Sequence, residues 1–321
     1  MKALRALSQG VIEVVDVEIP QKENNILIKT EIASICGSDL HMAFSGWGID
    51  KWPAEPGHPG HEAIGTVISG NGKFNNGDLV LTVPHIWNSK CFAEFQSVDA
   101  AHILKIDQHI HAPIENLLMS QQLGTVIFAA KQIPIIEGKI CLVIGQGSAG
   151  LFWNFILKYF GAKKVLSVEP NQNRLALSKK FGSDEVYNDS LKFAAKEICE
   201  KYPDSIDIVI EAVGTSETIN ESLKVVKDFG EVVFFGLPET VNYIPFDFST
   251  MFKNRVKAFT VFGAQDETNL LSFQYALELI SNRVIDVDGI LSHSFCISNG
   301  VKAYDFAKNM KAEVIKVGIS F

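Results

Sequence analysis

Cys36, His61 and Glu62 are the first residues of this chain whose types point to chemistry. A thiolate, an imidazole and a carboxylate are all ligands of Zn²⁺, and three such ligands leave a fourth tetrahedral position open for water or substrate. The group can therefore hold a metal ion. Three metal-capable residues also occur by chance in many chains, so the inference needs support from a second motif.

A glycine fingerprint, GQGSAG at 145–150, follows directly on the apolar run KICLVI. In such a strand–turn–helix unit Gly145 permits the tight turn, Gly147 lets the backbone approach a phosphate, and Gly150 lets the next helix pack closely on the sheet. The helix N-terminus then presents free N–H groups and the positive end of its dipole to a pyrophosphate. A metal group followed by a dinucleotide site suggests a zinc-polarised alcohol that passes a hydride to a nicotinamide.

Glu169 stands at the end of the next apolar run, about 20 residues beyond the fingerprint. An acid at this place chelates the adenosine ribose hydroxyls and repels a 2′-phosphate, so we expect NAD(H) to bind in preference to NADP(H). Arg174 can flank the adenosine, or it can be a surface residue at a helix start. A glycine-rich turn without any ligand is the alternative for the whole segment. The other positions expected at the cofactor begin the fingerprint helix or end later strands: Ser148, Ala149, Gly214 and Gly236.

The elements that must position these residues change in kind along the chain. Residues 1 to about 120 contain short β-type runs broken by Gly, Pro and Asn, starting with two short strands around a turn, as in an irregular antiparallel barrel. From about residue 122, apolar runs alternate with helical segments. Runs this continuous suit strands buried on both faces, which predicts a doubly wound parallel sheet. After about residue 267 a helical segment and mixed β/α segments complete the chain.

Length and composition fit a globular protein of two domains. The chain has 321 residues, 47% of them hydrophobic, and no apolar run approaches the roughly 18 residues that span a bilayer. A net charge of −8 argues against nucleic acid and anionic membranes as partners. The start lacks the apolar stretch of a signal peptide, and the cysteines are odd in number without CxxC spacing, which predicts a reduced, cytoplasmic protein. The cysteines are at positions 36, 91, 141, 199 and 296.

The sequence resembles the zinc-dependent medium-chain dehydrogenase/reductase family, which includes alcohol, sorbitol, threonine and glucose dehydrogenases. The most specific element is C-G-S-D-x-H at 36–41 followed by G-H-E at 60–62, and the resemblance covers essentially the whole chain. The matching segments are ICGSDLH (35–41), PGHE (59–62), FAEF (92–95), the fingerprint (145–150), DIVIEAVG (207–214) and VIKVGISF (314–321).

The resemblance implies an α/β fold in which a discontinuous, GroES-like catalytic domain, residues 1–122 and 267–321, surrounds a Rossmann NAD-binding domain, residues 123–266. It places the active site in the cleft between the two domains. Family members commonly pair the edge strands of their cofactor domains, and RVKAFTVFGA at 255–264 is a late β-type run that can serve this purpose. We therefore expect a homodimer or homotetramer.

By the same resemblance, Cys36 and His61 are zinc ligands, and Glu62 is a ligand or a carboxylate just outside the ligand sphere. Asp39 orients a ligand histidine. Zinc in such a site lowers the pKa of a bound hydroxyl, from about 16 for water towards about 7, and so generates the alkoxide that expels hydride.

Ser38 and His41 match the proton relay of the family, in which a hydroxyl, the cofactor ribose and an imidazole carry the alcohol proton to solvent. Their presence disfavours the alternative from a different functional class, a non-catalytic member that binds nucleotide or zinc. The metal-capable residues likewise disfavour the zinc-free quinone and enoyl reductases of the superfamily.

Two departures from the family pattern change the expected metal content. Many zinc members carry a lobe whose four closely spaced cysteines hold a structural zinc; here the segment from Gly77 to Cys91 is short and has no cysteine cluster, so we expect one catalytic zinc and no structural zinc. The family's further acidic or cysteine contributor appears as Gln121, as in some glucose dehydrogenases. Glutamine is a weak neutral ligand, better suited to holding a water or a substrate hydroxyl. Glu115 is a less favoured substitute.

The loop MAFSGWGIDKWPAEPGHP lies between the two metal motifs, and in the family it passes over the substrate cleft. Phe44 and Trp47 can line that cleft or can simply pack. Phe262-Gly263-Ala264 replaces the Phe-Arg-Tyr of sorbitol dehydrogenases, which weakens a sorbitol assignment. The expected reaction is NAD(H)-linked interconversion of a secondary alcohol, polyol or sugar hydroxyl and its carbonyl. A primary-alcohol or amino-alcohol dehydrogenase is the alternative within the family.

Overall fold

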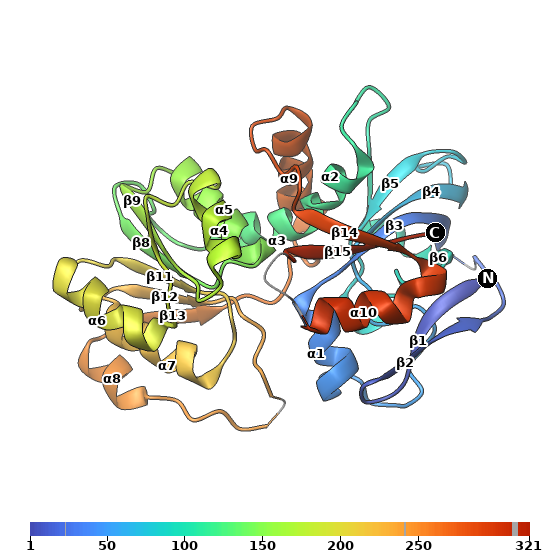
Figure 1. The fold of residues 1–321 in the computed structure, drawn as a ribbon. Helices are drawn as coiled ribbons and strands as arrows, with labels where there is room; N and C mark the ends of the chain where they lie inside the picture. Colours follow the sequence, from blue (N-terminus) through green and yellow to red (C-terminus); the bar gives the residue numbers. More distant parts are fainter. Residues whose placement is uncertain (23, 241, 310–313) are drawn as a thin grey trace. The chain divides into compact units, whose positions relative to one another are not determined.

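The computed structural model describes residues 1–321 except 23, 241 and 310–313. The chain divides into two compact units (Figure 1): residues 1–125 with 263–321 form unit 1, and residues 126–262 form unit 2. Each unit has its own main sheet. None of the described helices combines the length and the apolar character that a membrane crossing requires.

Unit 1 is built around a mostly antiparallel sheet. Its strand order is β14-β15-β3-β4-β5-β7, and β6 pairs with β3 outside this path. The long strand β3, ILIKTEIASI, buries all its apolar residues except the half-buried Leu27 and exposes its lysine, as expected where one face packs on a core. The strands are β3 (Ile26–Ile35), β4 (Ala63–Ser69), β5 (Leu79–Thr82), β6 (Phe95–Val98), β7 (Ile103–Lys105), β14 (Leu291–Cys296) and β15 (Lys316–Ser320).

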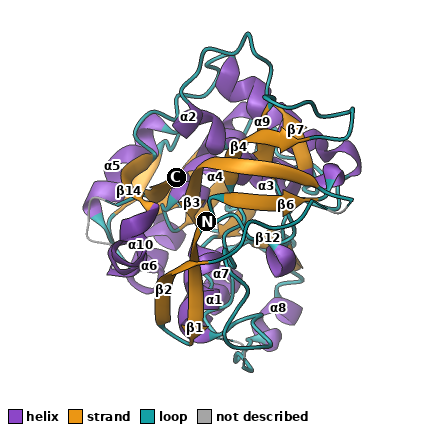
Figure 2. Cartoon of the chain, turned by 90° about the vertical axis from the view of Figure 1, so that its right-hand side faces the viewer, coloured by secondary structure: helices purple, strands orange, loops and turns teal. Residues whose placement is uncertain are grey.

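The chain begins with an antiparallel hairpin, β1 (Lys2–Ser8) with β2 (Val11–Asp16), as predicted. Figure 2 shows these two strands side by side, and both chain termini lie in unit 1. The apolar core beneath the sheet centres on Phe92 and Tyr304, whose rings meet edge to face. The helices of this unit are α1 (Gly37–Ser45), α2 (Ile114–Leu118), α3 (Ser120–Ala130, which continues into unit 2), α9 (Leu271–Ser281) and α10 (Gly300–Asn309), with 3₁₀ turns η1 (Ile86–Asn88), η2 (Ala100–His102), η3 (Thr268–Leu270) and η4 (Ile297–Asn299).

Unit 2 is a doubly wound parallel sheet, as predicted. The strand order is β10-β9-β8-β11-β12-β13, and Figure 1 shows α4 and α5 on one face with α6 and α7 on the other. The strands are β8 (Ile140–Ile144), β9 (Lys164–Val168), β10 (Glu185–Tyr187), β11 (Ile208–Glu211), β12 (Glu231–Phe234) and β13 (Lys257–Thr260). The helices are α4 (Ser148–Tyr159), α5 (Gln172–Lys180), α6 (Leu191–Lys201), α7 (Ser216–Val225) and α8 (Phe248–Lys253).

The central strands of unit 2 are apolar because helices cover both of their faces. ICLVI of β8, KVLSV of β9 and IVIE of β11 are buried almost throughout. The strand order reverses at β8, whose neighbours β9 and β11 lie on opposite sides. Ligands of such sheets bind beyond the carboxyl ends of the strands at this reversal. The fingerprint begins directly after β8.

β13 is the edge strand of the unit 2 sheet, and it pairs with β12 on one side. Lys257 N donates to Gly230 O at 3.0 Å, so the N–H of the next residue, Ala258, points to the open side. Phe262, just beyond the strand, is 51% exposed. An open edge beside an apolar side chain is a template for pairing with another chain.

We propose that two copies of the chain pair through β13, as a symmetric dimer or a dimer of dimers. Light scattering at micromolar concentration should give at least twice the 35.4 kDa mass of one chain. Ala258→Pro removes an outward N–H and should shift the population toward monomer. A monomeric wild type would refute the proposal.

Candidate metal and cofactor sites

Cys36 lies where β3 ends and α1 begins. It is the N-cap residue of α1, with extended backbone angles of φ −90° and ψ 159°. Its backbone N–H donates to Asp39 Oδ2 at 2.8 Å. A carboxylate on the first turn that accepts from the N-cap residue fixes the start of a helix. The half-buried thiol is therefore held at a rigid junction of strand and helix.

Asp39 also orients His61. The fully buried Oδ1 atom accepts a hydrogen bond from His61 Nδ1 at 2.8 Å. Burial by itself lowers the pKa of His61, but the charge and hydrogen bond of Asp39 outweigh it and raise that pKa well above the usual value. With Nδ1 engaged, Nε2 is the nitrogen that can face a metal. This geometry supports the orienting role suggested for Asp39.

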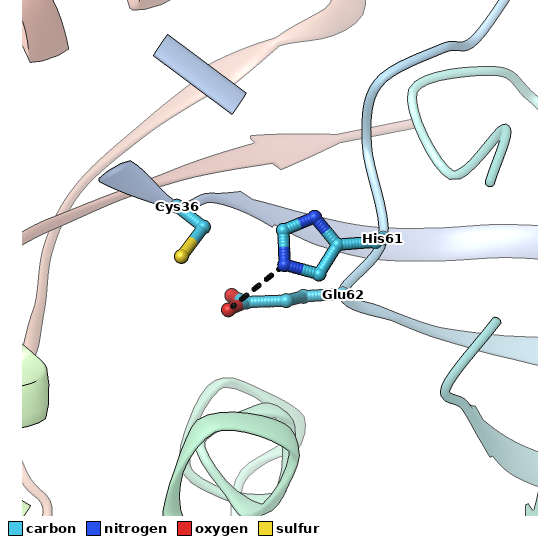
Figure 3. A group of neighbouring side chains, drawn as sticks. All are labelled: Cys36, His61 and Glu62. Atoms are coloured by element: carbon cyan, nitrogen blue, oxygen red, sulfur yellow. Dashed lines mark ion pairs between the residues drawn. The ribbon is translucent and has the colours of Figure 1, made fainter. Parts of the chain in front are cut away.

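The three side chains expected to bind metal lie together. In the described part of the chain, one ligand atom from each of Cys36, His61 and Glu62 lies within 4.8 Å of the other two. Figure 3 shows the sulfur, the imidazole and the carboxylate directed toward one another, with His61 Nε2 3.9 Å from Glu62 Oε1. This donor set fits zinc, and it leaves a coordination position for a further oxygen.

Glu62 has a partner that the sequence did not reveal, Lys316 of β15. Lys316 Nζ lies 2.8 Å from Glu62 Oε2 and 3.1 Å from Oε1, and both side chains are almost fully buried. Ser34 Oγ also donates to Glu62 Oε2. Burial raises the pKa of Glu62, but the charges of Lys316 and His61 outweigh it and lower that pKa. Glu62 is thus an ionised carboxylate held on two sides, which favours a place just outside the ligand sphere.

Two neighbouring glutamines lie in the first turn of α3, and the one beside the metal-capable group is Gln122. Its Nε2 lies 3.9 Å from Cys36 Sγ, and its Oε1 lies 3.5 Å from Lys316 Nζ. Gln121, the suggested contributor, is buried, and its backbone carbonyl accepts from Thr125 Oγ1 at 3.3 Å. The sequence selected the right segment but not the side chain that approaches the sulfur. Two features of the sequence could have indicated Gln122 and Lys316. Gln122 is a second amide next to Gln121, and Lys316 is a lysine within the apolar run VIKVGISF.

Ser38 and His41 follow Cys36 on α1. Residues three apart share a face of a helix, so the hydroxyl and the imidazole lie one above the other. Both residues are half-buried, and each retains contact with solvent. This arrangement suits groups that pass a proton outward.

The aromatic residues suggested for the substrate have different surroundings. Phe44 packs on Tyr304, with ring centroids 6.3 Å apart, and Lys308 Nζ lies 4.0 Å from the Phe44 ring centroid. Phe44 therefore contributes to the core of unit 1. Trp47 packs against Trp87 in a tilted arrangement, with centroids 5.0 Å apart and 30° between the ring planes. Trp87 is 48% exposed, so this pair presents an aromatic surface to solvent.

The fingerprint joins β8 to α4, as expected. Gly145 has φ +86°, in the left-handed region that favours glycine. A Cβ on Gly150 would lie 1.9 Å from Gly145 O, so only glycine lets α4 start this close to the turn. Gly147 is the N-cap of α4, and Ser148 and Ala149 form its first turn. The N–H groups of this turn have no partner within the helix and can bind a phosphate.

Glu169 lies just after β9, next to the fingerprint. Its Oε2 accepts from Gln146 N–H at 2.8 Å, and its Oε1 accepts from Asn171 N–H at 3.0 Å. Two backbone donors thus fix the carboxylate, while each oxygen keeps a lone pair for a ribose hydroxyl. This geometry supports the suggested adenosine contact.

The remaining cofactor candidates lie in loops of unit 2. Arg174 is in the first turn of α5, and its N–H donates to Asn171 Oδ1 at 3.3 Å. Gly214 follows β11 and Gly236 follows β12. Gly214 has φ +91°, and a Cβ there would lie 1.9 Å from Leu237 O, so the loops after these two strands pack directly on each other. Both glycines therefore lie at the carboxyl end of the sheet.

Comparison with known proteins matches both units. Residues 22–108 match the alcohol dehydrogenase GroES-like domain, and residues 149–282 match the zinc-binding dehydrogenase domain. The L-threonine 3-dehydrogenase of Pyrococcus furiosus is 28% identical in an alignment that covers 88% of this chain and 88% of that protein. The D-arabinitol dehydrogenase 1 of Uromyces fabae is 22% identical in an alignment that covers 95% of this chain and 93% of that protein.

A solved structure shares the fold over its whole length. Alcohol dehydrogenase TADH from Thermus sp. ATN1 matches with a TM-score of 0.85 over 100% of both chains, at 21% identity. The expected α/β fold with a GroES-like and a Rossmann-like part is thereby confirmed. The two domain matches and the similar proteins together show that the chain belongs to the zinc-type medium-chain alcohol dehydrogenases, a family of oxidoreductases.

Proposed function

We propose that this chain is a zinc-dependent, NAD(H)-linked dehydrogenase that interconverts a secondary alcohol and its ketone. The observation that carries the proposal is the cluster of Cys36, His61 and Glu62, with Asp39 hydrogen-bonded behind it. The dinucleotide fingerprint in unit 2 supports the redox half of the reaction.

Cys36 and His61 would hold the metal, with Glu62 beside it. When bound, zinc supplies a Lewis acid that lowers the pKa of an alcohol hydroxyl, and a nicotinamide supplies a hydride acceptor. Asp39 keeps the His61 ring in one orientation. Lys316 neutralises Glu62, and this matters because an unpaired buried carboxylate is strongly destabilising.

Ser38 and His41 would move the proton that the alcohol loses. Ser38 accepts it from the substrate hydroxyl, and His41 passes it toward solvent. Their half-buried positions on one face of α1 support this division of roles. Trp47 and Trp87 offer an apolar surface for the carbon skeleton of a substrate.

The names of the relatives support a small hydroxylated molecule as the substrate. They include L-threonine 3-dehydrogenase and D-arabinitol dehydrogenase 1. We propose a polyol, a sugar or another hydroxylated metabolite as the substrate. A hydroxy amino acid or amino alcohol is the second candidate, because several of the similar proteins are threonine dehydrogenases.

Zinc analysis combined with a screen of NAD reduction over alcohols, polyols and hydroxy amino acids tests the proposal. We expect about one zinc per chain and turnover of at least one secondary alcohol. Cys36→Ser should abolish turnover without unfolding unit 2, because the metal-capable residues all lie in unit 1. Cys199→Ser, which changes an exposed cysteine, is the matched control and should keep full activity. A stoichiometry near two, or full activity in Cys36→Ser, would contradict the proposal.

The relay predicts unequal effects of two substitutions on α1. Ser38→Ala removes the group that touches the substrate and should lower kcat by roughly 10²–10⁴-fold. His41→Ala should cost less, because water can replace a more remote group, and buffer bases should partly restore its activity. Ser45→Ala, on the same helix, is the control. Equal losses without rescue, accompanied by lost zinc, would show that the two residues only maintain the site.

Glu169 predicts the choice between the two nicotinamide cofactors. The carboxylate binds ribose hydroxyls and repels a 2′-phosphate, so kcat/KM should be higher with NAD than with NADP. Glu169→Ala should narrow or reverse the preference, whereas Glu200→Ala, an exposed glutamate of α6, should leave it unchanged. A wild type that prefers NADP would refute this assignment.

A further inference from the structure

Gln146, the second residue of the fingerprint, has a side chain that is completely buried. It stands between Gly145 and Gly147, neither of which has a side chain that could anchor the turn. Glycine backbone is the most mobile in a chain, so a turn of this composition needs some other constraint to keep one shape. Gln146 is the residue through which such a constraint can act.

The amide of Gln146 is hydrogen-bonded at every available position. Oε1 accepts from Asn154 Nδ2 of α4 at 2.6 Å and from Ser178 Oγ of α5 at 2.8 Å. Nε2 donates to Gly145 O at 3.0 Å and to Val143 O at 3.5 Å. The one amide therefore links the end of β8, the turn, α4 and α5.

The link extends into β9 and stays buried throughout. Asn154 Oδ1 accepts from Ser167 Oγ at 3.1 Å. Gln146, Asn154, Ser167 and Ser178 are all 0% exposed. A buried polar network in which each member is paired fixes a single arrangement, because an unpaired member in an apolar interior is strongly disfavoured.

The backbone of the same residue contacts the expected adenosine-binding carboxylate. Gln146 N–H donates to Glu169 Oε2, and Glu169 Oε1 accepts from Asn171 N–H at the start of α5. Ser178, which also binds the Gln146 side chain, lies on α5. Gln146 thus fixes the positions of the fingerprint turn, Glu169 and α5 relative to one another.

We propose that Gln146 is a positioning residue for the adenosine half of the cofactor, acting through the buried network of Asn154, Ser167 and Ser178. The inference rests on the proposed function, since it concerns how this chain binds a dinucleotide. Without the network the turn must be ordered at the moment of binding, which lowers affinity. The catalytic groups of unit 1 take no part in it.

Direct binding measurements test this proposal. NADH affinity is measured by its fluorescence, and ADP-ribose affinity by displacement of NADH, on the full-length chain. Gln146→Leu should weaken both ligands by the same factor, roughly tenfold, about the change expected from leaving one residue of backbone to be ordered on binding. The kcat at saturating NAD should remain within about twofold of wild type, because adenosine is remote from the chemistry.

Ser178→Ala is a milder second variant that removes one donor to Gln146, and it should weaken both ligands by a smaller factor. Ser183→Ala is the matched stability control, because this buried serine lies between α5 and β10, and its hydroxyl donates to Glu185 O at 2.8 Å and to none of the four side chains of the network. Unchanged affinity in Gln146→Leu and Ser178→Ala, or an equal loss in Ser183→Ala, overturns the inference. Failure of the wild type to bind NADH would instead overturn the proposed function, and the inference with it.

Discussion

The candidate metal site of unit 1 depends on one buried carboxylate, Asp39. It accepts 2.8 Å hydrogen bonds from the backbone of Cys36 and from the ring of His61. The first contact starts α1, and the second joins that helix to the segment that leads into β4. A charged hydrogen bond lost in the interior leaves an unsatisfied group that costs about 1–3 kcal/mol or more. The carboxylate that fixes the start of α1 thus also orients the imidazole of His61.

The last strand of the chain supplies the second charged contact of the site. β15 pairs antiparallel with β3, and Val317 lies opposite Ile35. This register brings Lys316 beside Glu62, within 2.8 Å. The return of the chain to unit 1 after unit 2 therefore supplies the lysine that balances this buried carboxylate, since Lys316 belongs to residues 263–321.

The parts that could be predicted from the sequence are those encoded over short distances. The turn at Gly145 and the strand–helix alternation each follow from residues within a few positions, and both appear in the structure. The side chains that were missed depend on contacts between distant segments. Lys316 reaches Glu62 through the pairing of β15 with β3, and Gln122 faces Cys36 through the orientation of α3. A local motif determines neither the register of two distant strands nor the orientation of a helix.

The same distinction applies to Gln146. The backbone geometry of a fingerprint requires its glycines but does not determine which residue stands between them. The burial of Gln146 therefore becomes visible only when α4 and α5 are in place. Local motifs thus indicated the chemistry, whereas the contacts that stabilise the motifs required the folded chain.

The zinc dissociation constant of an Asp39→Asn variant, measured by chelator competition, tests the central claim most directly. Asparagine keeps the volume of aspartate, but it has no charge and only one of its two side-chain polar atoms can accept a hydrogen bond, so it cannot accept from both Cys36 N–H and His61 Nδ1–H at the positions of the two carboxylate oxygens. Partners of this kind change metal affinity by roughly 10–100-fold, and a loss in that range is the expected result. Zinc affinity equal to that of the wild type, in a folded variant, would contradict the claim that Asp39 builds the site.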